Sequence, residues 1–190
     1  MSEPTASYTT GREPIASVPD LVNVSEDALN LFLAYVIGGA RWYHTPTGIE
    51  GLFTPAMRER MRPPLVAGRA ASVRGRFQPP PDHVYASDPA LTPTLIEAVC
   101  DWKGWGNGCS ADIRYQEGWR RLGDEAGWCV SFVAREMSVC TYAGPDQLAH
   151  AVARAAILAL WPQAPPEAQA FITEAVTDAE TARLGAVTEG

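Results

Sequence analysis

Four cysteines and a cluster of tryptophans are the residues of this 190-residue chain with the most distinctive chemistry. Cys100 and Cys109 flank the segment "CDWKGWGNGC", and Cys129 and Cys140 follow it. Structural zinc sites use thiolates at short spacings, such as two to four intervening residues. The cysteines here are separated by eight, nineteen and ten residues, so their spacing predicts no metal site. We interpret all four as reduced thiols, and we expect Cys109, Cys129 and Cys140 to be buried between neighbouring strands.

The glycine-rich part of the same segment, "GWGNG", is typical of a helix end. It follows a predicted helix, whereas a phosphate-binding loop lies between a strand and a helix. The glycines let the chain leave the helix and turn into a strand. Trp105 lies in this loop, and we expect its side chain to be a candidate contact surface, as we do for Trp119.

An arginine-rich stretch, "RERMRPPLVAGRAASVRGR" at residues 58–76, is the second candidate region. It could serve as a docking strip for phosphate groups or an acidic neighbour, because guanidinium groups bind both. The alternative is a solvated loop, and the sequence leaves the two open. The candidate partner-binding residues are Arg58, Arg60, Arg62, Arg69, Arg74 and Arg76, with Trp105 and Trp119.

No motif in the chain indicates catalysis. His44, His83 and His150 are far apart and form no H-E-x-x-H pair. There is no G-x-S-x-G motif, no Walker sequence and no paired-carboxylate pattern on a predicted helix face. We therefore expect a non-enzymatic protein, with no catalytic residue, metal or cofactor.

The charge and hydropathy of the chain limit the classes of partner that it is expected to bind. The formal net charge is −7, which disfavours general nucleic-acid binding because phosphate contacts need a positive surface. No run of eighteen apolar residues is present, and the N-terminus lacks the features of a secretion signal. We expect a cytoplasmic protein with a protein partner and without membrane contact. Whether it forms an oligomer stays open.

The first half of the chain alternates between a regular helix and irregular sequence. Residues 1–20, rich in Ser, Thr and Pro, are predicted to form a flexible arm. A helix should begin after Ser25 and end at Gly38-Gly39, since apolar residues between them recur at helical spacing. Residues 40–86 contain many prolines and glycines and predict a long irregular segment with a short helix over Thr54–Met61.

The second half is more regular and predicts a sheet with helices around it. Helix starts at Asp88-Pro89 and Thr92-Pro93 precede three segments of alternating polarity, and two helices follow. The expected strands are 109–116, 127–136 and 137–143, and the expected helices are 146–160 and 167–184. The order indicates an α+β fold in which a three-stranded antiparallel sheet packs with helices in layers, preceded by an N-terminal helix and a long irregular segment. We divide the chain into four parts. Residues 1–20 form a flexible arm, and residues 21–85 form a helix with a Pro/Gly/Arg-rich segment. Residues 86–161 form an α-β-β-β-α core domain, and residues 162–190 form an acidic C-terminal helix with a tail.

The predicted sheet has an inner face with Trp128, Val130 and Phe132. We expect the helix at 146–160 to cover this face with its small residues, which would allow helix and sheet to approach closely. Arg154, on the same helix, is predicted to point to solvent.

Three segments of the second half resemble a known family. They are "DPALTPTLIEAV", "GWCVSF" and "LAHAVARAAILAL", within residues 86–161. In order and character they resemble the phage-encoded ABA sandwich family of small proteins, named for its helix/sheet/helix layers. The resemblance implies an origin in a bacteriophage or prophage and expression in a bacterial cytoplasm. It implies no catalytic residue.

Three functions are then compatible with the sequence. The first is a phage accessory protein that binds a host protein, acting against a defence system or in host takeover. The alternative is a virion component, such as a decoration or minor head–tail protein, in which neighbouring subunits hold the terminal segments in place. The third is a module that captures a small anionic ligand beside Trp105, Trp119 and Trp128.

Overall fold

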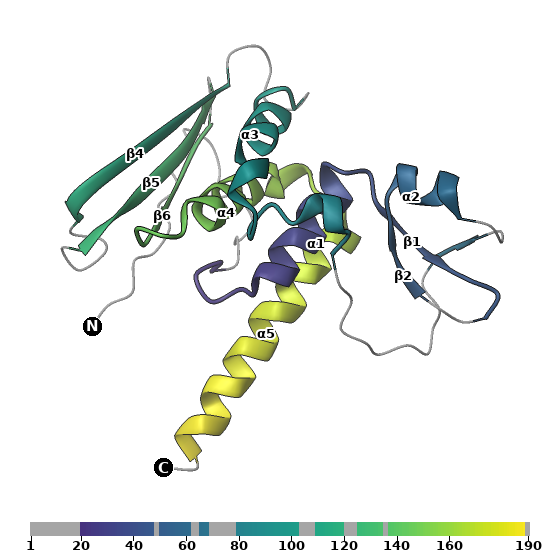
Figure 1. Cartoon of the computed structure of the whole chain (residues 1–190). Coiled ribbons are helices and arrows are strands. Elements are labelled where there is room, and N and C mark those ends of the chain that lie inside the picture. The colour runs from purple at the N-terminus through teal and green to yellow at the C-terminus, as the bar shows by residue number, and fades with distance from the viewer. Residues whose placement is uncertain are drawn as a thin grey trace.

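The computed structural model describes residues 20–47, 50–61, 65–68, 79–102, 109–119, 125–134 and 137–188, of which residues 118, 119, 137 and 178–188 are described by their backbone alone. Two three-stranded sheets lie at opposite ends of the molecule, with helices between them (Figure 1). The fold is α+β, as the sequence predicts.

The first helix, α1 (Glu26–Val36), begins and ends where the sequence predicts. The Ser25 hydroxyl accepts a hydrogen bond from the Ala28 N–H at 3.4 Å, and two acidic residues in the first turn complement the helix dipole. Gly39, with φ of 63°, adopts the left-handed conformation that ends the helix without steric cost. Every side chain from Ala28 to Tyr35 is buried, so α1 lies inside the molecule and not on its surface.

A small antiparallel sheet follows α1, which the sequence did not predict. Its strands are β1 (Arg41–His44), β2 (Glu50–Phe53) and β3 (Val66–Ala67), with β1 in the centre. Between β2 and β3 lies the expected short helix, α2 (Pro55–Arg60), capped by the Thr54 hydroxyl, which accepts from the Met57 N–H at 3.2 Å. Strands of two to four residues are too short to show an alternating pattern, and the surrounding prolines and glycines led us to expect irregular structure.

Two short 3₁₀ turns lead into the second half of the fold. They are η1 (Pro81–His83) and η2 (Pro89–Leu91), and α3 (Thr92–Cys100) continues directly from the second. Asp88 caps η2, because its carboxylate accepts the Ala90 N–H at 2.9 Å. The start predicted at Asp88-Pro89 is therefore confirmed, and α3 does begin at Thr92. The prediction that Thr92 caps it is wrong: the N-cap is Leu91, and the buried Thr92 hydroxyl makes no hydrogen bond.

The main sheet contains β4 (Ser110–Trp119), β5 (Glu125–Ala134) and β6 (Met137–Ala143), all antiparallel, with β5 in the centre. This confirms the three predicted strands and the hairpin between the last two. Val130 and Phe132 are fully buried on the inner face, where Phe132 is opposite Ala111 on β4 and Val139 on β6.

The remaining helices are α4 (Leu148–Leu160) and α5 (Pro166–Thr188), joined by η5 (Trp161–Gln163). Ten of the thirteen residues of α4 are buried, so this helix is surrounded by protein on all sides. The prediction that Arg154 points to solvent is wrong for this reason. The Arg154 guanidinium is largely buried, its Nη1 donates to the Tyr142 carbonyl at 3.4 Å, and burial lowers its pKa.

The elements form successive layers along the molecule (Figure 1). The main sheet packs on α4, α4 packs on α1 and α3, and α1 packs on α5, with the small sheet at the far end. One continuous apolar core joins these layers, from Leu52 on β2 to Val139 on β6. Phe32 of α1 stacks on Trp161 of η5 within it, with ring centroids 5.9 Å apart.

Candidate functional site

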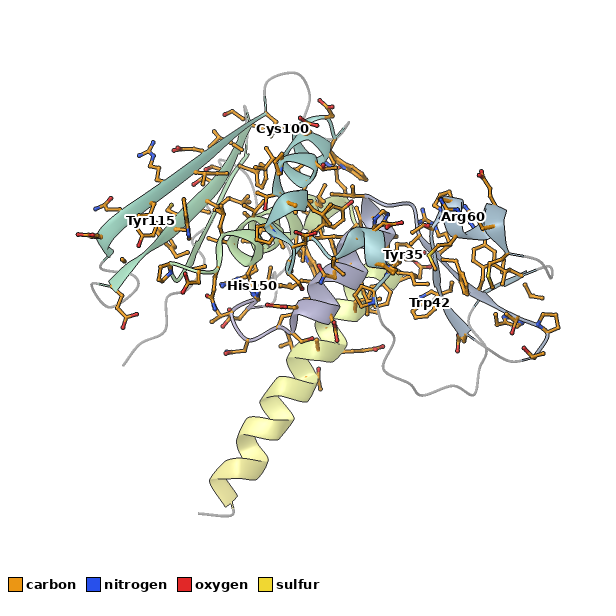
Figure 2. The ribbon with its side chains drawn as sticks, viewed as in Figure 1. Tyr35, Trp42, Arg60, Cys100, Tyr115 and His150 are labelled. Atoms are coloured by element: carbon orange, nitrogen blue, oxygen red, sulfur yellow. The ribbon has the colours of Figure 1, made fainter. Side chains whose placement is uncertain are left out.

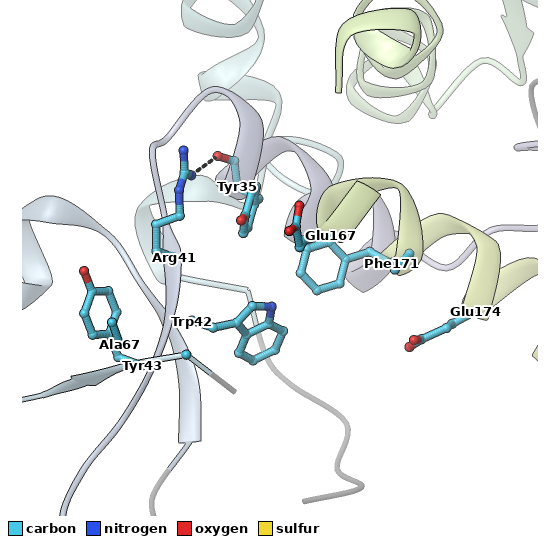
Figure 3. Close-up of a pocket in the computed structure, with 10 residues that line it drawn as sticks. Tyr35, Arg41, Trp42, Tyr43, Ala67, Glu167, Phe171 and Glu174 are labelled. Carbon is cyan, nitrogen blue, oxygen red and sulfur yellow. Dashed lines mark hydrogen bonds between the residues drawn. The ribbon is translucent and has the colours of Figure 1, made fainter. Parts of the chain in front are cut away.

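The turn from α1 into β1 places an arginine and two aromatic side chains beside one another. Arg41 donates from Nη1 to the carbonyls of Tyr35 and Ala40, at 2.9 and 2.7 Å. Its guanidinium also lies over the Tyr35 ring, 4.4 Å from the centroid, in a cation–π contact. Arg41 is thereby held against the end of α1, and the next residue, Trp42, points toward α5 (Figure 3).

Helix α5 contributes the opposite wall. Phe171 packs against Trp42 and Tyr35, with ring centroids 5.7 and 6.1 Å away. Glu167 and Glu174 lie one turn before and one turn after Phe171, so all three share one helix face. Both carboxylates are exposed, while Phe171 and Trp42 are half-buried.

Together these residues line a cavity of about 520 Å³ between β1, β3, α1 and α5. Its walls are aromatic, its rim carries two carboxylates, and Arg41 lies at the end away from Glu174 (Figure 3). The pKa of Tyr35 is raised, mainly by burial; Arg41 lowers it and Glu167 raises it further. We call this feature the aromatic–acidic cavity.

The chemistry of this cavity suits a cation on an apolar stem. Aromatic faces attract ammonium and guanidinium groups, and nearby carboxylates pair with them. The chain itself provides two examples in this region. Arg41 lies on Tyr35, and Arg58 lies over Tyr43, 5.1 Å from the centroid, while its Nη1 donates to the Tyr43 hydroxyl at 2.6 Å.

The predicted arginine strip is only partly described. Arg58 is half-buried and attached to Tyr43 on β1, whereas Arg60 is exposed on α2. Arg62, Arg69, Arg74 and Arg76 lie outside the described residues, as does Trp105. Whether these arginines dock a partner stays a prediction.

Trp119 belongs to β4, where its backbone pairs with Glu125. Because β4 and α2 lie at opposite ends of the molecule, the structure does not bring Trp119 together with Arg58 and Arg60 (Figure 1). Trp128 makes a T-shaped contact with Tyr115, 4.9 Å between centroids, and its indole N–H donates to the Pro145 carbonyl at 2.7 Å. This donor is therefore already used and is not offered to an anionic ligand.

The four cysteines form two separate pairs. Cys129 and Cys140 have their Sγ atoms 3.3 Å apart, and Cys109 shares a side-chain hydrogen bond with Cys100. Burial, with a smaller contribution from Cys100, raises the pKa of Cys109 to about 12. Within the described residues no three His, Cys, Asp or Glu side chains gather in a way that could hold a metal ion.

A polar network joins α1, α4 and the loop before η2, which the sequence did not indicate. The Ser87 hydroxyl donates to Glu26 Oε2 at 2.9 Å, and the other Glu26 oxygen lies 3.8 Å from His150 Nδ1 (His150 is labelled in Figure 2). The carboxylate thus lies between the hydroxyl and the imidazole. In a nucleophilic triad the imidazole lies between them, so this network does not activate Ser87.

Comparison of the chain with protein-family models, with curated proteins and with solved structures gave no match. No helix in the described part of the chain has both the length and the apolar character to cross a membrane.

The sequence could not have indicated the aromatic–acidic cavity as a whole. Its walls come from β1 and α5, which are more than a hundred residues apart in the chain, and β1 itself was not predicted. One signal was present: Glu167, Phe171 and Glu174 are spaced to lie on one face of a predicted helix.

Proposed function

We propose that this chain is a phage-encoded, non-enzymatic protein that binds a host protein, and that the aromatic–acidic cavity receives a lysine or arginine side chain of that partner. The phage origin rests on the sequence resemblance within residues 86–161. The observation that carries the binding role is the placement of two exposed glutamates one turn to either side of Phe171, in the lining of a cavity that Trp42 also lines.

Two properties of the chain support a basic protein partner over other ligands. The overall net charge of −7 attracts a positively charged surface and repels nucleic acid. The position of Arg41 agrees with this choice, because it is turned toward Tyr35 and two backbone carbonyls. Trp42, Phe171 and Glu174 line the part of the cavity away from Arg41, and this is where the proposal places the incoming cation (Figure 3).

Calorimetric titration with a short arginine-rich peptide tests the chemistry of the cavity directly. The wild-type protein should bind this peptide and not a glutamate-rich peptide of equal length. The double variant Glu167→Gln, Glu174→Gln should bind it about tenfold more weakly, because each partly exposed ion pair contributes up to about 1 kcal/mol. Glu97→Gln, which removes an exposed carboxylate on α3, is the matched control and should bind as wild type does.

The same variants then identify the biological partner. A host protein retained from bacterial lysate by the wild type and by Glu97→Gln, but lost with the double variant, would support the proposal. Equal binding of the arginine peptide by the wild type and the double variant would refute the cavity as the site. A lysate partner retained equally by all three proteins would place the interface elsewhere on the surface.

A further inference from the structure

Cys129 and Cys140 face each other across the hairpin of β5 and β6. In the sheet register Cys129 is opposite Tyr142, and Cys140 is opposite Ser131, so the two cysteines are diagonal neighbours on one face. This is the face opposite Val130 and Phe132, so it points away from α4. The separation of 3.3 Å between the Sγ atoms exceeds the length of a disulfide bond by only about 1.3 Å.

The surroundings of the pair favour a bond between the two sulfurs over metal binding. The Ser131 hydroxyl, 4.0 Å away, and the Tyr142 side chain also interact with Cys129 Sγ. Arg114 on β4 is opposite Cys129, but its guanidinium is paired with Asp112 at 2.6 Å. In the described residues no third metal-ligating side chain joins the two thiols.

We propose that Cys129 and Cys140 form a reversible disulfide that joins β5 to β6 when the protein meets a small-molecule disulfide such as oxidised glutathione. Cys140, the more exposed of the two, bonds to one sulfur of the small disulfide and releases the other half as a thiol. Cys129 then displaces the attached half and bonds to Cys140. The two cysteines lose two electrons and two protons in total, and the small disulfide gains both as two free thiols.

The bond has a defined structural effect. It closes a short loop around the β5–β6 turn and holds the diagonal register of the hairpin. The oxidised protein should therefore melt at a higher temperature than the reduced protein, and added dithiothreitol should reverse the increase. Burial, with a smaller contribution from Cys140, raises the pKa of Cys129 to about 11. Bond formation should therefore accelerate between neutral and alkaline pH, as the thiolate fraction increases.

Peptide mapping provides the decisive experiment, because trypsin separates all four cysteines. Cleavage after Arg121, Arg135 and Arg154 puts Cys129 in peptide 122–135 and Cys140 in peptide 136–154. After treatment of the full chain with oxidised glutathione, free thiols are alkylated and the protein is digested without reductant. The expected product is peptide 122–135 linked to peptide 136–154, with a mass lower by two hydrogen atoms than the sum of the two, and reductant should separate them.

Two single-cysteine variants test whether the linked product requires both thiols. Cys140→Ser and Cys129→Ser should each abolish the linked product and leave the remaining cysteine alkylated or glutathione-bound. If the wild-type digest instead carries both cysteines unlinked, or links either of them to Cys100 or Cys109, the proposal is overturned. Because the wild-type digest alone decides the matter, the result does not depend on whether the variants fold.

Discussion

Asn30 is a buried polar residue that holds a distant loop in place. Its side chain is only 1% exposed, although it lies in the middle of α1. The Asn30 side-chain oxygen accepts the Ala86 N–H at 2.7 Å, and its nitrogen donates to the Ser87 hydroxyl at 3.2 Å. Through these two bonds α1 holds one backbone N–H and one side-chain hydroxyl of the loop that leads into η2.

Replacing Asn30 should reveal how much these hydrogen bonds contribute to the free energy of unfolding. Asn30→Leu leaves the buried Ala86 N–H without an acceptor, so the free energy of unfolding should fall by about 1–3 kcal/mol. Asn23→Leu, the same change at an exposed position before α1, should alter it by no more than about 0.5 kcal/mol. Urea denaturation measures both, and equal effects of the two variants would contradict this role for Asn30.

His150 makes the stability of the protein depend on pH. Burial lowers its pKa, Arg154 lowers it further, and Glu26 partly opposes both. The unfolded chain therefore takes up a proton at this histidine near pH 6.5, whereas the folded protein takes it up only at lower pH. The free energy of unfolding should decrease as the pH falls below about 7.

A substitution isolates the contribution of this imidazole. In His150→Gln the decrease in unfolding free energy between about pH 7 and pH 5 should be smaller than in the wild type, since one proton-binding group of the unfolded state is gone. Urea denaturation at a series of pH values measures the slope for each protein. Identical slopes for the variant and the wild type would show that His150 does not cause the pH dependence.

At the scale of the elements, α4 is the helix on which the others pack. It contacts β5 and β6 on one side, α1 and α3 on others, and its Ala155, Ala156 and Ala159 are fully buried. Thr141 of β6 adds a polar contact, because its hydroxyl donates to the Ala151 carbonyl at 2.8 Å. The small side chains of α4 allow these neighbours to approach on several sides at once.

A large side chain at Ala156 should disrupt the packing of α4 against its neighbours. Ala156→Phe should reduce the free energy of unfolding by about 1–3 kcal/mol or more, because the buried site has no room for a ring. Ala56→Phe, at an exposed position of α2, should change it by no more than about 0.5 kcal/mol. Arg154 is not a suitable control, since its side chain is itself largely buried and bonded to the Tyr142 carbonyl. Thermal and urea unfolding of both variants test the prediction. An Ala156→Phe variant as stable as the wild type would indicate that α4 packs more loosely against its neighbours than the structure shows.

The elements that the sequence predicted are those with a long periodic pattern. Ser25 and the apolar spacing after it identify α1, and the alternation around Val130 and Phe132 identifies β5. The sequence did not predict β1–β3, because each strand has at most four residues and the second sheet depends on contacts with α1 and α5. Arg154 was misplaced because its charge suggested solvent, whereas the position of α4 between several elements is a property of the whole fold.

At the scale of the whole molecule, the two proposed sites lie far apart. The Cys129–Cys140 pair belongs to the main sheet, and the aromatic–acidic cavity lies beside the small sheet, with α4 and α1 between them (Figure 1). Burial also differs along the molecule, so we expect local stability to differ as well. The centre of the molecule consists mainly of buried helix, whereas β3 at the far end has two exposed residues and pairs with β1 alone.

The rate of amide hydrogen exchange should follow this difference in local stability. Amides of α4 are buried inside the core and should exchange only through unfolding of the whole molecule, so their exchange should be the slowest. Amides of Ala67 and Gly68 should exchange faster by several orders of magnitude, because both residues are exposed and the Gly68 N–H, just after β3, is held by one bond to the Trp42 carbonyl at 2.9 Å. Exchange followed by mass spectrometry of peptides from residues 65–68 and 148–160 measures the difference. Equal protection of the two peptides would mean that the small sheet unfolds only together with the core.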